Sequence, residues 1–330
     1  MDKIRVGVLR GGQSPEFEAS IKTGADVLIN LPDDKYHPVD LLITKNGVWH
    51  IDGMDTSPEE IKESVDVIFN ALHGGYGENG EILNLINELE IPYTGSNTLS
   101  SNITSNKILS KKVFKSLGFK TPLHEVIEDF RKKDDEDLKE GYFKDIAENV
   151  FRKIPPPWII KPAQGGASYD TYYADNFYDL YIALLKVAQT PGDILIEEFI
   201  NGREVVVGVI DNYRGENQYT LLPNEIKKVN KIFDYGSRSE GNYDLLNLGY
   251  HEKDKKEFLE DSAKKIHKEL GLEHYSSVDF LISPKGVYVL EVDSLPHLHK
   301  HSVFRKALES VGSNMSHFLD HIITLALKKK

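Results

Sequence analysis

Short apolar runs alternate with amphipathic segments along the N-terminal part of the chain. Runs of about four to eight residues rich in Val, Ile and Leu are typical of buried strands, and apolar residues that recur roughly every three or four positions predict helices. Strands that alternate with helices predict a parallel α/β sheet. We expect strands at residues 4–9, 39–44 and 65–72, and helices at residues 16–31 and 81–89.

The same two patterns continue through the rest of the chain. Residues 130–153 are highly charged, and we interpret them as a solvated helical excursion rather than a functional segment. A run of three prolines then ends this excursion. We expect further strands at residues 158–160, 194–199 and 205–210, and further helices at residues 105–117, 258–270 and 304–328.

Composition narrows the class of protein. The chain has 330 residues, enough for two or three domains, and 40% of them are hydrophobic, so a full core can form. The net charge of −12 argues against a nucleic-acid-binding surface, and the absence of cysteine excludes disulfides, thiolate metal sites and a Cys nucleophile. No run approaches the roughly 18 apolar residues of a membrane span, and the N-terminus lacks a signal-peptide pattern. We therefore expect a soluble cytoplasmic protein with no nucleic-acid or membrane partner.

Candidate chemistry is concentrated in two short strand-like runs near the C-terminus. Asp279 lies in the first run, while Glu291 and Asp293 lie two residues apart in the second and so point to the same side of a strand. Carboxylates that converge in this way suit Mg²⁺, which shares its ligands with phosphates, and Lys107 and Lys161 could supply positive charge for those phosphates. The alternative is that these acids simply face solvent. The flanking apolar residues Val278, Phe280, Leu290 and Val292 favour a built site.

Glycine-rich turns follow several of the expected strands. Residues 11–12 and 73–77 come directly after strands, at the sheet edge where α/β proteins collect their ligands. Residues 164–168 form a similar loop shortly after Lys161. Each turn alone is a weak signal, because many such glycines serve only a tight turn.

Taken together and in order, these motifs resemble the D-alanine–D-alanine ligases of the ATP-grasp superfamily over nearly the whole chain. Residues 11–18 and 71–80 are similar to the family's first two strand-to-helix loops, and residues 91–96 are similar to its domain-boundary signature. The resemblance implies an ATP-grasp fold of three α/β domains, with ATP between the second and third. Their expected ranges are residues 1–95 for an N-terminal parallel α/β domain on the substrate side, 96–199 for a central domain, and 200–330 for a C-terminal domain with the metal site.

The resemblance also implies which residues contact ATP and its metal ion, Mg²⁺ or Mn²⁺. The family's third metal ligand is usually an asparagine, so Asp293 adds one negative charge here. The implied metal ligands are Asp279, Glu291 and Asp293. The implied ATP contacts are Lys107 and Lys161 at the phosphates, Ser168 in the loop over them, Glu197 at the adenine amino group, Phe199 and Ile200 at the adenine edge, Glu204 at the ribose, and Arg238 in the lid.

The substrate side keeps part of the family pattern. Glu16, His73 and Ser302 match family residues that face the substrates. Four other positions depart from the pattern, and loss of a preorganised cation at such a place typically raises a barrier by several kcal/mol. The departures are Ser277 for an arginine, His297 for a glycine, Ala167 for a serine and Ser239 for a tyrosine.

The chemistry that the resemblance implies is ATP-dependent joining of a carboxylate to an amine through an acyl phosphate, as in peptidoglycan biosynthesis for the cell wall. The expected partner is a small-molecule amino acid or related substrate, and a homodimer is left open. The smaller side chains at Ala167 and Ser239 predict a first substrate other than D-alanine, either larger or without the amine.

Three other interpretations stay open at this point. The chain could be an ATP-grasp ligase for a different acid or amine, because the departures fall on the substrate side. It could also be a nucleotide-binding protein without ligase activity, because the ATP residues are retained. The histidines at 297, 299 and 301 leave a zinc site as a third alternative, although no further ligand at a typical spacing completes it.

Overall fold

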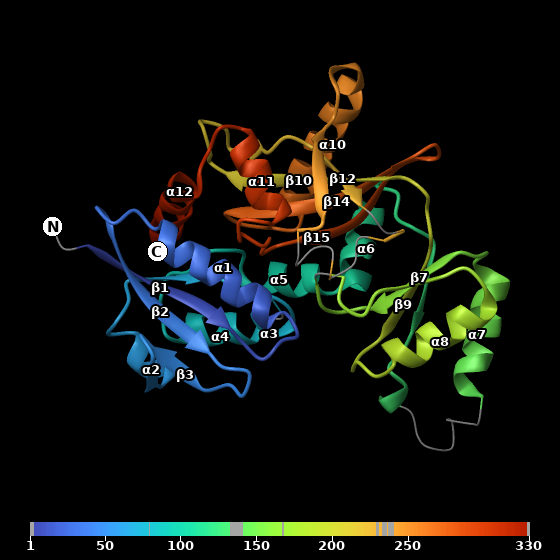
Figure 1. The fold of residues 1–330 in the computed structure, drawn as a ribbon, viewed down its shortest axis with the longest axis horizontal. Coiled ribbons are helices and arrows are strands. Elements are labelled where there is room, and N and C mark those ends of the chain that lie inside the picture. Colours follow the sequence, from blue (N-terminus) through green and yellow to red (C-terminus); the bar gives the residue numbers. More distant parts are fainter. Residues whose placement is uncertain are drawn as a thin grey trace.

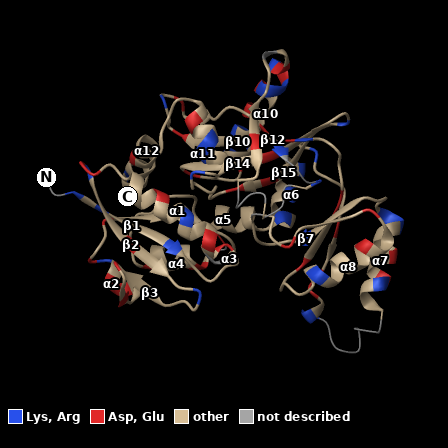
Figure 2. Ribbon diagram, viewed as in Figure 1, with Lys and Arg blue, Asp and Glu red and all other residues tan. Residues whose placement is uncertain are grey.

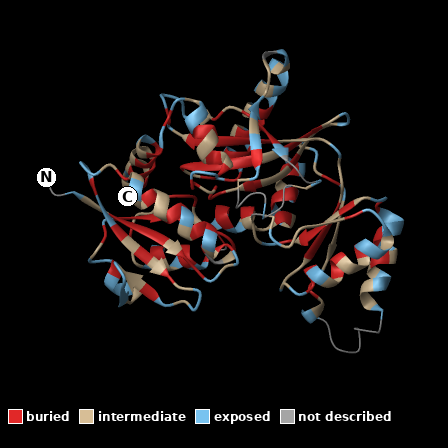
Figure 3. Ribbon diagram, viewed as in Figure 1, coloured by how far each residue is buried: buried red, intermediate tan, exposed pale blue. Residues whose placement is uncertain are grey.

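The computed structural model describes residues 3–78, 80–132, 141–166, 168–228, 231–232, 236 and 241–328. Three lobes are each built around their own sheet (Figure 1). The C-terminal lobe also includes residues 98–116, which precede the central lobe in the chain. Strands are largely buried, whereas the outer faces of α7, α8 and α10 are exposed (Figure 3). No helix within the described ranges is both long and apolar enough to cross a lipid bilayer.

The N-terminal lobe contains a five-stranded sheet in the order β4-β3-β2-β1-β5. β1 pairs in parallel with both β2 and β5, as the alternation of strands and helices predicted, while β3 and β4 extend the sheet in antiparallel fashion. The strands are β1 (Ile4–Gly11), β2 (Tyr36–Ile43), β3 (Trp49–Ile51), β4 (Met54–Thr56) and β5 (Val67–Asn70). The helices are α1 (Phe17–Asn30), α2 (Pro58–Ile61), α3 (Gly75–Glu78) and α4 (Glu81–Glu88).

The central lobe contains a four-stranded antiparallel sheet in the order β6-β9-β7-β8. Its strands are β6 (His124–Ile127), β7 (Trp158–Pro162), β8 (Tyr172–Ala174) and β9 (Ile194–Glu198), and its helices are α7 (Tyr142–Lys153) and α8 (Phe177–Val187). Lysine, arginine and acidic residues are interspersed on the outside of both helices (Figure 2). The predicted solvated excursion is nevertheless only half right, because Ala147 and Val150 of α7 are buried in the core of this lobe.

The C-terminal lobe is built on an antiparallel sheet in the order β13-β12-β10-β14-β15, with β11 paired to β10. Helix α10 packs against β10 and β14, and helices α5 and α6 pack against β15. The strands are β10 (Arg203–Asp211), β11 (Gln218–Thr220), β12 (Asn224–Lys228), β13 (Tyr243–Asn247), β14 (Tyr275–Ser283) and β15 (Gly286–Asp293). The helices are α5 (Thr98–Ser105), α6 (Lys107–Ser116), α10 (Lys253–Glu269), α11 (Val303–Ser310) and α12 (Met315–Lys328).

The last helix returns to the first lobe. Phe318 and Ile322 of α12 are fully buried in the same hydrophobic core as Val6 of β1 and Phe69 of β5. Asp320 of α12 also accepts a hydrogen bond from the hydroxyl of Tyr36 at 2.7 Å. Both chain termini therefore lie at this end of the molecule (Figure 1).

Candidate active site

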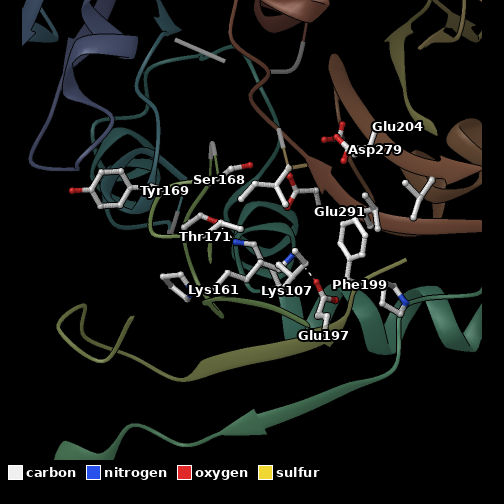
Figure 4. A pocket seen from close by; sticks show the side chains of 18 of the residues that line it. Lys107, Lys161, Ser168, Tyr169, Thr171, Glu197, Phe199, Glu204, Asp279 and Glu291 are labelled. Carbon is white, nitrogen blue, oxygen red and sulfur yellow. Dashed lines mark hydrogen bonds and ion pairs between the residues drawn. The ribbon is translucent and has the colours of Figure 1, made fainter. Parts of the chain in front are cut away.

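A cavity of about 280 Å³ opens between the four-stranded sheet and the C-terminal sheet. Residues of β7 and β9 line one side, and residues of β10, β14 and β15 line the other. Figure 4 shows the side chains of Lys107, Lys161 and Glu197 together, with Glu204 and Asp279 on the opposite side. The cavity brings together these predicted ATP-contacting residues: Lys107, Lys161, Ser168, Glu197, Phe199, Ile200 and Glu204.

One buried carboxylate in the cavity wall holds two lysines. Oε1 of Glu197 is 2.5 Å from Nζ of Lys111, and Oε2 is 2.8 Å from Nζ of Lys161. Burial alone would raise the pKa of Glu197, but the two ammonium groups lower it to about 2. One negative charge thus faces two positive charges, which leaves this wall net positive and suited to an anion.

Lys107 is placed by the start of α6. The side chain of Asn106 caps this helix by accepting hydrogen bonds from the backbone of Ile108 at 3.0 Å and Leu109 at 3.1 Å. The backbone N–H of Lys107 donates to the carbonyl of Ala163 at 2.8 Å, and its Nζ donates to the carbonyl of Gly165. The glycine-rich loop is therefore fixed beside a lysine at a helix N-terminus, where the helix dipole favours an anion such as phosphate.

The opposite wall presents carboxylates from two paired strands. Asp279 of β14 lies directly across from Glu291 of β15, and directly paired residues project to the same face of a sheet. Asp293 follows two residues later, as the alternation along the strand predicted. Burial, together with the negative charges of Glu16 and Glu291, raises the pKa of Asp293 to about 6. A bound cation would relieve this crowding of negative charge.

These carboxylates fit a magnesium ion that is shared with phosphates. Within the described ranges, no three His, Cys, Asp or Glu side chains are gathered closely enough to hold a metal ion by themselves. Mg²⁺ usually takes only one or two carboxylates and completes its shell with phosphate oxygens and water. The pair Asp279 and Glu291 meets that requirement. The alternative zinc site at residues 297, 299 and 301 gains no support, because these histidines are not gathered as ligands either.

The hinge between β9 and β10 forms the apolar end of the cavity. Phe199 donates its backbone N–H to the carbonyl of Pro157 at 2.8 Å, and its ring packs edge-on against Tyr173. Ile159 of β7 and Leu290 of β15 line the cavity from opposite lobes. Two apolar walls and a backbone hinge suit a flat heterocycle. The specific contacts predicted for Phe199 and Ile200 with an adenine edge stay predictions.

A second cavity of about 80 Å³ adjoins the first. Both cavities are lined by Lys107, Gly166, Asp279 and Glu291. A group transferred from a phosphate bound in the first cavity can therefore reach a molecule bound in the second. The second cavity is further lined by Glu78, Ser277, Asp293, His297, His299 and Ser302. It therefore brings the metal-ligand strands and the predicted substrate side together.

The predicted substrate residues lie in and around this second cavity. Ser302 lines it and caps α11 by accepting the backbone N–H of Arg305 at 3.4 Å. Glu16 is 3% exposed and lines the first cavity. His73 lines neither cavity; its Nε2 is 2.9 Å from Oγ1 of Thr23, and its ring lies 4.2 Å from that of His297. Burial, together with nearby His297, lowers the pKa of His73 well below its usual value.

Several residues of this site were not predicted from the sequence. Lys111, the second partner of Glu197, lies one helical turn after Lys107, so the spacing of four residues within the predicted helix was an available signal. Glu78 is buried beside Asp293 and Glu16, and burial together with their negative charges raises its pKa well above the usual range. Three positions named above, Ala167, Arg238 and Ser239, lie outside the described residues.

Comparison with known proteins gives one consistent family. A sequence model described as D-ala D-ala ligase C-terminus matches residues 113–324, and one described as D-ala D-ala ligase N-terminus matches residues 52–96. The D-alanine--D-alanine ligase of Thermoanaerobacter sp. (strain X514) is 31% identical over 362 residues, which cover 99% of this chain and 98% of that protein. The D-alanine--D-alanine ligase of Desulforamulus reducens is 32% identical over 329 residues, which cover 99% of each.

A solved structure shows the same arrangement of elements. The crystal structure of the D-alanine--D-alanine ligase from Bacillus anthracis complexed with ATP matches with a TM-score of 0.78 at 26% identity, covering 98% of each chain.

Proposed function

The chain belongs to the D-alanine–D-alanine ligase family and has its ATP-grasp fold, and on that premise we propose that it is an ATP-dependent ligase that joins the carboxylate of one small molecule to the amine of another. The observation that carries this proposal is the meeting of the two cavities at Lys107, Asp279 and Glu291. Cations line one side of that junction and carboxylates line the other.

The first cavity supplies what a nucleoside triphosphate needs. Lys161, held by Glu197, and Lys107 at the start of α6 place positive charge where phosphates would lie. Asp279 and Glu291 would hold Mg²⁺, which when bound would neutralise charge on the phosphate oxygens. The resulting positioning and electrostatic stabilisation are the main protein contributions to phosphoryl transfer.

The second cavity supplies the place of reaction. The carboxylate of the first substrate attacks the terminal phosphorus, ADP leaves, and an acyl phosphate forms. The amine of the second substrate then attacks the acyl carbon, the bond from that carbon to the phosphate oxygen breaks, and phosphate leaves as the amine gives up a proton. Residues 165–166 and residues of β15 line this cavity, and exclusion of water by such walls would limit hydrolysis of the acyl phosphate.

Phosphate release and trapping test this proposal directly. The protein is incubated with ATP, Mg²⁺, hydroxylamine and a panel of D- and L-amino acids, hydroxy acids and short peptides. An acyl phosphate reacts with hydroxylamine to give a hydroxamate and free phosphate, so at least one acid should give hydroxamate together with at least as much phosphate, because an amino acid that also serves as the amine releases phosphate alone. Absence of hydroxamate with every acid would refute ligase activity and leave nucleotide binding alone.

Three finer predictions accompany this function. We expect a cytoplasmic enzyme of peptidoglycan biosynthesis that acts on D-alanine or a related compound, in line with the names of its relatives. A homodimer, which the sequence leaves open, is the assembly to be tested. Light scattering on the purified protein tests the assembly state, and a monomer at micromolar concentration would count against it.

A further inference from the structure

Lys111 is a buried lysine that lies behind the wall of the first cavity. Its side chain is 1% exposed, and it lines neither cavity. It lies on α6 one helical turn after Lys107, which lines both cavities. A buried ammonium group is costly unless a charged partner compensates it, so the partners of Lys111 indicate what its charge does.

The charged partner of Lys111 is the carboxylate of Glu197. Nζ of Lys111 is 2.5 Å from Oε1, and Nζ of Lys161 is 2.8 Å from Oε2 of the same carboxylate. Glu197 and Lys161 line the first cavity, whereas Lys111 does not. The three side chains thus form a row of alternating charge, and Lys111 is the member of the row that does not reach the cavity.

The ammonium group of Lys111 is held from both sides of the cavity. Glu197 belongs to β9 of the central lobe, and the carbonyl oxygen of Leu290, on β15 of the C-terminal lobe, lies 3.5 Å from Nζ. The pKa of Lys111 is lowered by burial, and the negative charges of Glu197 and Glu291 limit this fall. These contacts fix the place of the ammonium group and favour its charged form.

The charge of Lys111 determines how much positive charge the row presents to a ligand. Glu197 carries a negative charge at neutral pH, because its pKa is lowered to about 2. With two lysines against one carboxylate, the row keeps a net positive charge. Without Lys111, the charge of Glu197 would offset that of Lys161, and the row would present no net charge to a phosphate.

We propose that Lys111 is a positioning residue for the nucleotide, which balances the charge of Glu197 so that Lys161 can attract the phosphates. Lys111 acts through Glu197 and touches no ligand itself. Its effect should therefore be large for a nucleoside triphosphate and small for the nucleoside, which has no charge to attract. This inference rests on the nucleotide site of the proposed function.

Two ligands that differ in their phosphates test this role. Adenosine and a non-hydrolysable ATP analogue, both with Mg²⁺ at neutral pH, compete with a fluorescent ATP analogue, and the ratio of their two affinities is the readout. Lys111→Gln keeps an N–H donor near Glu197 but carries no charge, so the preference for the ATP analogue should fall roughly tenfold. A general loss of structure would weaken both ligands alike. An unchanged ratio would therefore overturn the proposal.

A double variant separates net charge from the ion pair itself. Lys111→Met combined with Glu197→Gln removes one charge of each sign, so Lys161 keeps its charge with no carboxylate at position 197 to offset it. Replacement of both members of a buried ion pair by neutral side chains is often tolerated. The affinity ratio should return close to the wild-type value. A ratio as low as that of Lys111→Gln would overturn the proposal, because the ion pair rather than the net charge would then decide the affinity.

Lys112→Gln is the matched control. Lys112 is exposed on the same helix, and its loss changes the total charge of the protein by as much as the loss of Lys111. We expect a nearly unchanged ratio, and a fall equal to that of Lys111→Gln would overturn the specific role of Lys111. Should Lys111→Gln fail to fold, the double variant still decides, because a ratio far below that of wild type would overturn the proposal.

Binding by the wild type separates this inference from the proposed function. If the wild type binds adenosine as tightly as the ATP analogue, the nucleotide site is refuted, and the proposed function and the role of Lys111 fall together. If the wild type prefers the ATP analogue and Lys111→Gln keeps that preference, only the role of Lys111 is refuted. The expected ratios without any hydroxamate would support the role of Lys111 and refute the ligase.

Discussion

The two adjoining cavities treat charge in opposite ways. In the first, Glu197 stands between Lys111 and Lys161, and its pKa is lowered to about 2. In the second, Glu78 and Asp293 crowd one another, and burial together with nearby negative charge raises the pKa of both. The wall of the first cavity holds preformed ion pairs and keeps a net positive charge that suits an anion, whereas the second cavity gains most when a cation arrives.

This difference indicates how the two sites are used. In a site with preformed ion pairs, the charged groups lose their water during folding, before any ligand arrives. The charge pattern of such a site is therefore fixed, and it binds the same kind of ligand. A site of crowded acids changes its charge with pH and with bound metal, so the ligand that it favours can change with these conditions. Within one family, the nucleotide side can therefore stay fixed while the substrate side diverges.

Removal of one charge from each wall of the first cavity should have the largest effect. Lys161→Ala combined with Glu291→Ala removes a phosphate cation and a metal ligand, each worth about 2 kcal/mol. We expect roughly a thousandfold weaker binding of a non-hydrolysable ATP analogue with Mg²⁺, measured by calorimetry. The matched control is Lys62→Ala with Glu90→Ala, which removes an exposed ion pair of 3.3 Å. Equal affinity of the wild type and the Lys161→Ala, Glu291→Ala variant would show that this cavity is not the nucleotide site.

Loss of Lys111 should test whether the ion pairs of the first cavity stabilise the folded protein. Lys111→Met leaves the buried Glu197 with one cation instead of two, and breaking a buried ion pair typically costs about 3 kcal/mol. We expect a clear fall in the urea midpoint of unfolding. Lys112→Met, at the exposed neighbouring position, should leave the midpoint nearly unchanged. If both variants unfold alike, the lysine pair around Glu197 does not stabilise the fold.

A fall in pH should change the contributions of the two cavities to the free energy of unfolding in opposite directions. The lowered pKa of Glu197 gives stability that is present above its ordinary value of 4.5 and is lost as the pH falls through about 2. Between pH 6 and pH 3, the free energy of unfolding of Glu197→Gln should therefore fall by about 2 kcal/mol less than that of the wild type.

The raised pKa of Glu78 has the reverse consequence. Its contribution is present at low pH and is lost as the pH rises above 4.5 towards the raised value, so Glu78→Gln should gain stability over wild type with increasing pH. Urea unfolding at several pH values, in EDTA, measures both variants. Parallel pH profiles for the two variants would contradict the contrast between the cavities.

The smallest expected effect comes from a helix cap. Asn106→Ala removes the cap of α6 and should cost about 1 kcal/mol of stability. It should also weaken nucleotide binding a few-fold, because Lys107 is the next residue. Asn176→Ala removes the equivalent cap of α8, which is the matched control. Similar stability losses with a binding loss only at Asn106 would sharpen the assignment of α6 to the nucleotide side, whereas equal binding in both variants would count against it.

Local sequence patterns predicted many of the strands and helices. Apolar runs located β1, β5 and β7, and the acidic runs lie on β14 and β15 as expected. Helix α5 was missed because its buried face consists of Ser100, Ser101 and Thr104, so it has no apolar stripe. The further helix predicted within residues 304–328 is present as two helices, α11 and α12.

The resemblance named residues of the first cavity that are far apart in sequence, whereas local patterns alone could group only residues on neighbouring strands. Asp279, Glu291 and Asp293 lie on adjacent strands, and strand alternation is enough to place them on one face. The contact between Glu16 and His297 joins opposite ends of the chain, and no periodicity reports such a pair. The shifted pKa values likewise depend on burial, which only the packed structure supplies.

Because α12 packs against the N-terminal lobe, the core of that lobe is complete only after α12 has been synthesised. Phe318 and Ile322 complete a core that begins with Val6, yet α12 is made roughly 240 residues after β5. At typical rates of translation, the growing chain waits on the order of tens of seconds for that helix. During this time one apolar face of the N-terminal sheet is open to chaperones. A polypeptide that stops before residue 315 would lack Phe318 and Ile322 in this core, so the N-terminal lobe depends on α12 for its complete packing.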